Sequence, residues 1–212
     1  MVVFNLGLLG IYKYLLFMLT SLNQWFSIHL PVPQITLPIG ISFFTFQAMS
    51  YVIDVYRGDG KVQKNLINVC LYISFFPQLI AGPIVRYIDV ARELDNRTHS
   101  WDDVALGLRR FLVGLAKKII IADNFALLMK LFRESSQPSV LFYWMYAVAF
   151  AFQIYFDFSG YSDMAIGMGR MVGFHYLENF NYPYEAKSIR EFWRRWHISL
   201  SSFFRDYVYI PL

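Results

Sequence analysis

The sequence predicts an all-α, polytopic membrane helical bundle with broken, re-entrant and amphipathic helices. Of its 212 residues, 57% are hydrophobic and only 16% are charged, whereas soluble domains average roughly 45–50% apolar and about 25% charged residues. The apolar residues form runs long enough for a helix to cross the roughly 30 Å core of a bilayer. Proline and glycine interrupt several runs, which predicts that some helices break inside the bundle.

Charge and cysteine content argue against several classes of function. The net charge is +4, but the basic residues lie between apolar runs and form no continuous patch, so no nucleic-acid partner is predicted. They fit better as the flanks of membrane spans, beside lipid head groups. The single cysteine, Cys70, lies in an apolar run, and no Cys/His cluster has metal-ligand spacing. Neither an internal disulfide nor a metal site is therefore predicted.

The first two predicted spans cover residues 2–22 and 35–56. A proline-containing linker separates them, because proline breaks a helix. Pro38 and Gly40 near the start of the second span predict a kinked or broken entry. The short basic loop at residues 57–64 is the best candidate for a cytoplasmic loop, because such loops carry an excess of lysine and arginine.

A third predicted span, residues 66–85, contains two prolines and Gly82 and cannot be one regular helix. Irregular backbone at membrane depth is tolerated only when it is buried in protein or lines a wet cavity. Gln78 and Arg86 would then face that cavity. The alternative is a proline-marked helix exit at the interface, which Arg86 would fix. Residues 86–103 are polar and mixed in sign, which predicts a surface loop or a short amphipathic helix.

The middle of the chain predicts two long helices. Residues 104–128 repeat apolar side chains at three- and four-residue steps beside a basic flank, which could meet lipid head groups or an anionic substrate. Residues 139–158 form the clearest span. Asp157 and Asp163 would be costly facing lipid, so we expect them to face a cavity or to pair with arginines. Four glycines interrupt residues 160–173, which predicts a tightly packed or re-entrant segment.

The densest mixture of charge, aromatic rings and hydroxyls lies near the end of the chain. Ser188 has the character of an N-cap, and the pattern after it predicts one helix. In that helix Glu191 reaches Arg194 and Arg195 one turn later. His197 falls on an apolar face of the same helix, which it shares with Trp193, Leu200 and Phe204.

Four stretches of this sequence resemble the membrane-bound O-acyltransferase (MBOAT) family, in particular its bacterial alginate O-acetyltransferase branch. A similar final block occurs in relatives that move D-alanine toward teichoic acid. The final stretch is the most distinctive, with Trp196-His-Ile-Ser-Leu-Ser201 at its centre. The four stretches are Phe76–Arg86, Phe156–Met164, Glu178–Tyr184, and Phe192–Ser201 with Arg205–Leu212.

This resemblance implies a multi-pass protein of the bacterial cytoplasmic (inner) membrane that transfers an acyl group. The donor would be a cytoplasmic thioester, either acetyl-CoA or an acyl-carrier type, with no bound cofactor. The acceptor would be a hydroxyl of an exported polysaccharide, reached with downstream periplasmic or extracellular acetyl-transfer proteins. The family usually has a second histidine, in a Trp-His-Gly context, further along. We therefore expect residues 1–212 to be the central fragment of one such domain, truncated at both ends.

The resemblance maps the catalytic histidine of the alginate branch onto His197, and the chemistry suits it. Deprotonating an acceptor hydroxyl needs a base with a pKa near neutrality, which histidine provides. Arg194, Arg195 and Ser201 are candidate donors to the developing oxyanion. The candidate substrate-binding set is completed by Gln78 and Asp157, for which a purely structural role is the alternative.

Other functions stay open from the sequence alone. D-alanyl transfer toward teichoic acid uses the same chemistry. A transporter or channel would explain broken spans and acidic residues at membrane depth, but the sequence shows no inverted repeat. An inactive fragment that serves as a scaffold is the third alternative.

Overall fold

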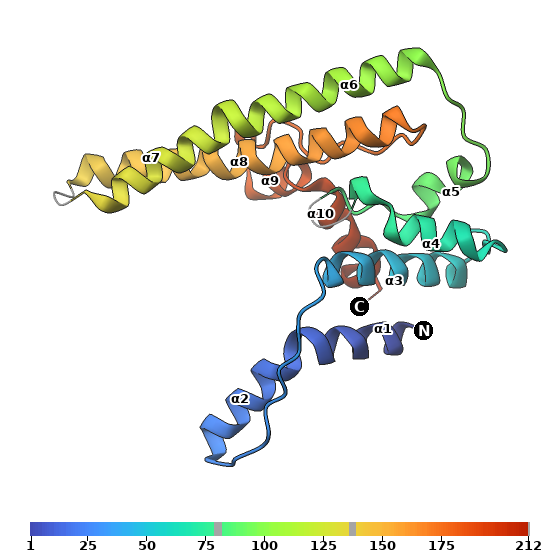
Figure 1. The fold of residues 1–212 in the computed structure, drawn as a ribbon, viewed down its shortest axis with the longest axis horizontal. Helices are drawn as coiled ribbons and strands as arrows, with labels where there is room; N and C mark the ends of the chain where they lie inside the picture. The colour runs from blue at the N-terminus through green and yellow to red at the C-terminus, as the bar shows by residue number, and fades with distance from the viewer. Residues whose placement is uncertain (79–81, 136–138, 212) are drawn as a thin grey trace.

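The computed structural model describes residues 1–78, 82–135 and 139–211, and all regular structure in these ranges is helical (Figure 1). This confirms the all-α prediction. Residues 79–81 of the predicted third span, Pro138 of a predicted turn, and Leu212 lie outside the described residues. The α-helices are α1 (Val2–Leu9), α2 (Leu15–Phe26), α3 (Ile41–Arg57), α4 (Leu66–Ser74), α5 (Tyr87–Asp95), α6 (Trp101–Ala116), α7 (Asp123–Glu134), α8 (Val140–Met171), α9 (Ile189–Arg195) and α10 (Ile198–Phe204).

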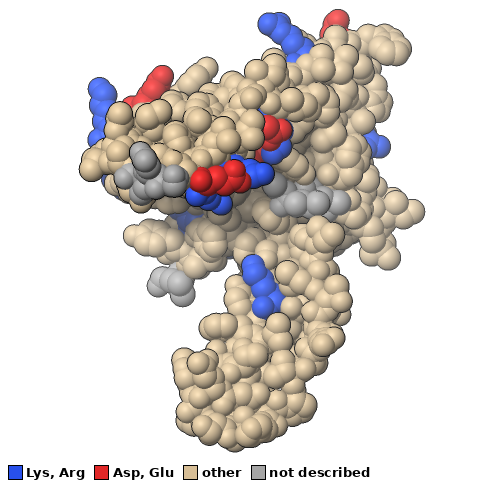
Figure 2. Space-filling model, turned by 60° about the vertical axis from the view of Figure 1, so that its left-hand side comes forward, with Lys and Arg blue, Asp and Glu red and all other residues tan. Residues whose placement is uncertain are grey.

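Two helices are long and apolar enough to cross a membrane. The first is continuous from Val2 to Phe26, because a π-helical segment, Gly10–Tyr14, joins α1 to α2. The second is α8. Almost none of the first helix is buried inside the protein, and α2 projects away from the remaining helices (Figure 1). Figure 2 shows a face formed mostly by uncharged side chains. Such surfaces suit contact with lipid.

The second and third predicted spans are shorter than the sequence suggests. Helix α3 has 17 residues and begins only after Gly40, whose φ of 76° breaks the chain as predicted. Helix α4 has nine residues, so residues 66–85 do not form one span. It stops at Ser74, just before Pro77, which cannot supply an amide proton to a continuing helix. The structure therefore confirms the broken backbone but not a full third crossing.

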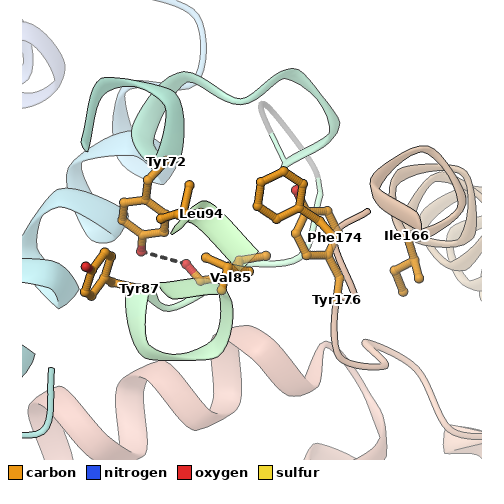
Figure 3. Packing of buried hydrophobic residues seen from close by; sticks show 8 residues of the cluster. Tyr72, Val85, Tyr87, Leu94, Ile166, Phe174 and Tyr176 are labelled. Atoms are coloured by element: carbon orange, nitrogen blue, oxygen red, sulfur yellow. Dashed lines mark hydrogen bonds between the residues drawn. The ribbon is translucent and has the colours of Figure 1, made fainter. Parts of the chain in front are cut away.

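A buried cluster joins α4, α5 and the loop after α8 (Figure 3). The hydroxyl of Tyr72 donates a hydrogen bond to the carbonyl oxygen of Val85 at 2.8 Å, which holds the irregular segment before α5. Phe174 and Tyr176 reach the same cluster from beyond α8. Helix α5 is the short amphipathic helix that the sequence offered as one alternative for residues 86–103.

Helices α6 and α8 pack antiparallel along their glycines. A π-helical segment, Lys117–Ala122, continues α6 into α7, so the amphipathic helix predicted at residues 104–128 is confirmed and longer. A Cβ atom on Gly114 would lie 2.5 Å from the carbonyl oxygen of Gly160, and one on Gly107 would lie 2.6 Å from that of Gly167. Residues 160–171 thus belong to α8, and the prediction of a re-entrant segment is wrong. The glycines permit close packing and do not break the helix.

Ion pairs join the same two helices. Arg110 and Lys117 of the α6 side both bind Asp163 of α8, at 2.9 and 2.6 Å. Lys118 binds Asp157 at 2.5 Å. Asp163 therefore pairs with an arginine, as predicted, whereas the partner of Asp157 is a lysine. Much of the basic flank of residues 104–128 is occupied by these acids, which leaves it less free for lipid head groups or an anionic substrate.

Candidate active site around His197

His197 lies at a break between two helices. Helix α9 ends at Arg195 and α10 begins at Ile198, so the predicted single helix with His197 on its apolar face is wrong. Ser188 caps α9 as predicted, accepting a hydrogen bond from the amide of Glu191 at 3.1 Å. His197 itself adopts φ 44° and ψ 57°. This left-handed conformation costs a non-glycine residue on the order of 1–3 kcal/mol, and such strain gathers at functional sites.

The loop before α9 stabilises the break between α9 and α10. The amide of Ile198 donates to the carbonyl oxygen of Asn179 at 2.9 Å, and the amide of Asn181 donates to that of Arg195, also at 2.9 Å. Two backbone groups at the break, the amide of Ile198 and the carbonyl oxygen of Arg195, thus have hydrogen-bond partners in a separate segment. The left-handed turn at His197 is therefore set by tertiary structure.

The side chain of Asn179 fixes the tautomer of His197. Its Oδ1 lies 3.1 Å from His197 Nδ1 and 3.2 Å from the backbone amide nitrogen of Ser199. A backbone amide can only donate, so the Asn179 atom that faces it must be the carbonyl oxygen. His197 Nδ1 must then carry the proton, which leaves Nε2 with a free lone pair. The Ser199 hydroxyl donates to the same oxygen at 2.9 Å and accepts from the amide of Ile84 at 3.1 Å.

Burial keeps the imidazole neutral. His197 is 7% exposed, and the ring of Phe158 packs edge-on against it at 4.7 Å between centroids. Removal from water disfavours the charged form, and this burial lowers the pKa of His197 to about 4. The residue lies outside the two candidate membrane spans. At neutral pH, His197 is therefore uncharged, and its pKa lies well below the near-neutral value expected of a general base.

The other predicted site residues have different partners in the described part of the chain. Arg195 binds Glu191 at 2.7 Å, which confirms the predicted pairing but occupies the guanidinium. Arg194 is exposed. The Ser201 hydroxyl donates to the carbonyl oxygen of Trp196 at 3.4 Å. The predicted oxyanion donors are thus not gathered around the imidazole.

Gln78 and Asp157 also have structural contacts. Gln78 is buried, and its side-chain amide donates to the carbonyl oxygen of Tyr72. Asp157 is held by Lys118 and by the side chain of Gln153, whose Nε2 lies 3.3 Å from its carboxylate. Neither has a contact with His197 among those that the structure describes. For both, the structural alternative accounts for the observed contacts.

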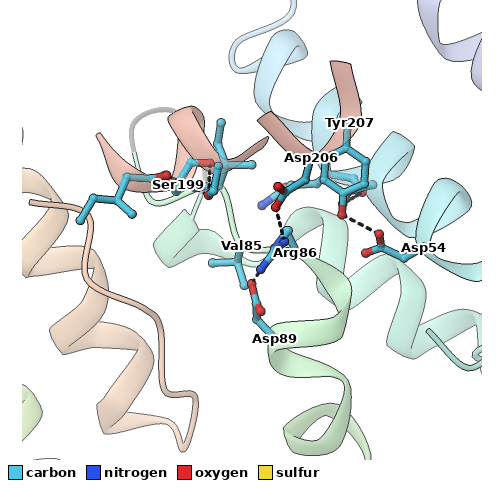
Figure 4. Close-up of polar contacts among 12 residues, drawn as sticks. Asp54, Val85, Arg86, Asp89, Ser199, Asp206 and Tyr207 are labelled. Carbon is cyan, nitrogen blue, oxygen red and sulfur yellow. Dashed lines mark hydrogen bonds and ion pairs between the residues drawn. The ribbon is translucent and has the colours of Figure 1, made fainter. Parts of the chain in front are cut away.

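Arg86 lies at the start of α5 and not at the end of a helix, so it does not fix a helix exit as one interpretation predicted. It binds Asp89 at 3.3 Å and Asp206 at 3.0 Å (Figure 4). Beside it, the hydroxyl of Tyr207 donates to Asp54 at 2.6 Å. These contacts tie the segment after α10 to α3 and α5, and so hold α10 in place from the side away from α9.

A cavity of about 440 Å³ lies next to the residues that hold His197, although His197 itself is not one of its lining residues. Asn179, which contacts His197, and Ile198, which follows it in the chain, line the cavity together with Ser159 and Ser162 of α8. Asn179 lies in Glu178–Tyr184, one of the stretches that resemble the family, where the sequence predicts no role for it. No sequence pattern joins it to a histidine 18 positions away.

The described part of the chain thus combines two apolar helices long enough to cross a membrane with a buried, neutral imidazole held by Asn179. The pattern of the MBOAT, membrane-bound O-acyltransferase family, matches residues 62–212, and the chain belongs to this family.

Three relatives show which activities are nearby. The chain is 49% identical to a probable alginate O-acetylase of Azotobacter vinelandii, over 100% of this chain and 43% of that protein. It is 39% identical to a peptidoglycan O-acetyltransferase of Helicobacter pylori, over 98% of this chain and 45% of that protein. For a teichoic acid D-alanyltransferase of Bacillus subtilis the values are 33%, 81% and 45%. The chain therefore spans less than half the length of these relatives.

Proposed function

We propose that the whole protein transfers an acetyl group from a cytoplasmic thioester toward hydroxyls of an exported, alginate-like polysaccharide, with His197 as general base. The observation that carries this proposal is the Asn179–His197 pair, which leaves Nε2 of a neutral imidazole free. The 49% identity to a probable alginate O-acetylase supports acetyl as the group transferred. Residues 1–212 are proposed to be the central part of one such domain.

The proposed reaction balances without a cofactor. His197 Nε2 takes the proton of an acceptor hydroxyl as its oxygen attacks the thioester carbonyl carbon. The carbon–sulfur bond then breaks, and the thiolate leaves with the proton that the imidazolium returns. The products are an O-acetyl ester and a free thiol. The donor can be acetyl-CoA or an acyl-carrier thioester, since both present the same reacting bond.

The proposed setting is the bacterial inner membrane, crossed several times by the whole protein. The first helix and α8 supply two candidate crossings. Periplasmic or extracellular acetyl-transfer proteins would pass the group on to the polysaccharide. D-alanyl transfer is the alternative from the same family, and it has the weaker support because the identity to the D-alanyltransferase is 33%.

Isotope labelling of the exported polymer tests this function. We expect cells that express the whole protein, with any partner genes, to place labelled acetate on the polymer as alkali-labile ester, and cells without it to place none. Labelled D-alanine should not be incorporated. Ester-linked D-alanine in place of acetate would support the alternative, and absence of both labels would favour an inactive scaffold.

Replacing Asn179 by aspartate is expected to shift the pH dependence of transfer. The parent base has a pKa of about 4, so its activity should not fall between pH 8 and pH 5.5 through protonation of His197. A carboxylate at the position of Asn179 Oδ1, 3.1 Å from Nδ1, would stabilise the imidazolium and raise this pKa by about 1–3 units. Because only the neutral base is active, the acid limb of the kcat/KM profile should move to higher pH.

The matched control for this shift is Asn181→Asp, which adds the same charge two residues along. Asn181 contacts the site through backbone atoms, so its variant should shift the acid limb less. The profile is measured in membrane vesicles between pH 4.5 and 8. An unchanged acid limb in Asn179→Asp would show that Asn179 does not hold the catalytic imidazole.

A further inference from the structure

The cavity beside His197 contains polar groups that the described chain leaves without partners. These are the hydroxyls of Ser159 and Ser162 and the side-chain nitrogen of Asn179. The three residues are 3%, 2% and 1% exposed. Buried polar atoms in native proteins almost always have a hydrogen-bond partner, so three orphaned groups in one cavity wall indicate a partner that enters the cavity.

The orphaned groups specify the chemistry of that partner. Oδ1 of Asn179 is occupied by His197 and Ser199, so the remaining Nδ2 can only donate and requires an acceptor oxygen. Ser159 and Ser162 lie three residues apart on one face of α8, and each hydroxyl can donate or accept. All three polar atoms, Asn179 Nδ2 included, are covered in the observed rotamers. Rotation about χ1 can turn a serine hydroxyl toward the cavity.

The charges around the cavity favour an uncharged ligand. Arg110 is held between Asp163 and Glu178, and Lys117 binds Asp163. These two cations and two anions balance, so the described lining residues offer no uncompensated positive charge to a phosphate or carboxylate. Aromatic rings, including Tyr155 and Phe180, supply apolar wall for the remainder of the ligand.

We propose that this cavity binds the uncharged, carbonyl- or hydroxyl-bearing part of a reactant, with Asn179 Nδ2 and the hydroxyls of Ser159 and Ser162 as its hydrogen-bond partners. The carboxamide of Asn179 then binds the ligand through Nδ2 and holds His197 through Oδ1. The identity of the ligand rests on the proposed acyl transfer, whereas the site rests on the cavity itself. Two sources present this chemistry: the amide and thioester end of the acyl donor, and the alcohol of the acceptor.

Ligand-induced thermal stabilisation of the whole protein in detergent tests this site. The probes are S-acetyl-N-acetylcysteamine, which carries the uncharged end of a thioester donor, and methyl α-D-mannopyranoside, an uncharged polyol. Adenosine 3′,5′-bisphosphate is the anionic probe. We expect one uncharged probe to bind, which identifies the source. The double variant Ser159→Ala/Ser162→Ala should bind that probe about tenfold or more weakly, since two hydrogen bonds are lost.

The matched control is Ser74→Ala. The Ser74 hydroxyl donates to the carbonyl oxygen of Cys70 within its own helix at 2.7 Å, and this variant should bind the probe like the parent. The proposal is overturned if neither uncharged probe binds, if the double variant binds the probe as tightly as the parent, or if the bisphosphate competes for the same site. Repeating the titration in His197→Asn protein separates the two proposals, because this cavity should still bind when transfer is lost.

Discussion

Replacing His197 by asparagine is expected to slow acetyl transfer by about 10²- to 10⁴-fold while the whole protein still folds and inserts. Asparagine tolerates the left-handed conformation that His197 adopts at φ 44°. Its side-chain nitrogen can take the place of Nδ1 and donate to Asn179 Oδ1, an interaction now 3.1 Å long. The variant therefore removes little except the lone pair of Nε2. The measurement is acetyl ester on the exported polymer per molecule of membrane-inserted protein.

Two further variants serve as controls for His197→Asn. His29→Asn makes the same exchange at an exposed histidine of the linker after α2 and should keep parent activity. His197→Gly removes the whole imidazole but relieves the backbone, because glycine adopts positive φ readily. It should be as inactive as His197→Asn. Activity within about threefold of the parent in His197→Asn would remove the imidazole from the chemistry.

The sequence predicts a helix well where the length and apolar composition of that one segment determine it. The run before Phe26 and the run after Ser139 both form helices long and apolar enough to cross a membrane, because length and apolar composition suffice. It fails where another segment intervenes. The apolar stripe through Trp193, His197 and Leu200 is present in the sequence. The helix is nevertheless broken in its middle, where the amide of Ile198 donates to Asn179 and the carbonyl oxygen of Arg195 accepts from Asn181.

The candidate site shows the same division between local and tertiary information. His197 was identifiable because it lies in a distinctive aromatic and basic stretch. Arg195 was predicted both to pair with Glu191 and to serve the oxyanion, and the structure shows the local pair. Asn179 gained a role only when its Oδ1 was found between Nδ1 of His197 and the amide of Ser199. Whether Asn179 Oδ1 meets His197 Nδ1 depends on how two segments 18 residues apart are placed in the fold, which the sequence does not show.

The glycines of α8 were visible in the sequence, but their partners on α6 were not. Residues 160–173 were predicted to be tight or re-entrant because glycines gather there. The structure pairs Gly160 with Gly114 and Gly167 with Gly107, seven residues apart on each helix. A spacing of seven returns to the same helix face after two turns. The pairs therefore form one continuous seam between antiparallel helices.

Replacing Gly114 by valine is expected to destabilise the whole protein by about 1–3 kcal/mol or more. The new Cβ would lie 2.5 Å from the carbonyl oxygen of Gly160 and 2.8 Å from the amide nitrogen of Met164. Both obstacles are backbone atoms, so no side-chain rotation relieves the clash and α6 must move away from α8. That movement would also displace Phe158, which packs against His197, so acetyl transfer should fall with stability.

The measurements for Gly114→Val are the thermal unfolding midpoint in detergent and acetyl transfer in membranes. Gly7→Val is the matched control, because a Cβ at Gly7 meets no atom within 4 Å and its helix is exposed. The control should keep the parent midpoint, and Gly114→Val should lower it by several degrees. A parent-like midpoint and activity in Gly114→Val would mean that α6 and α8 are not packed on their glycines. The position of α8 beside His197 would then need another explanation.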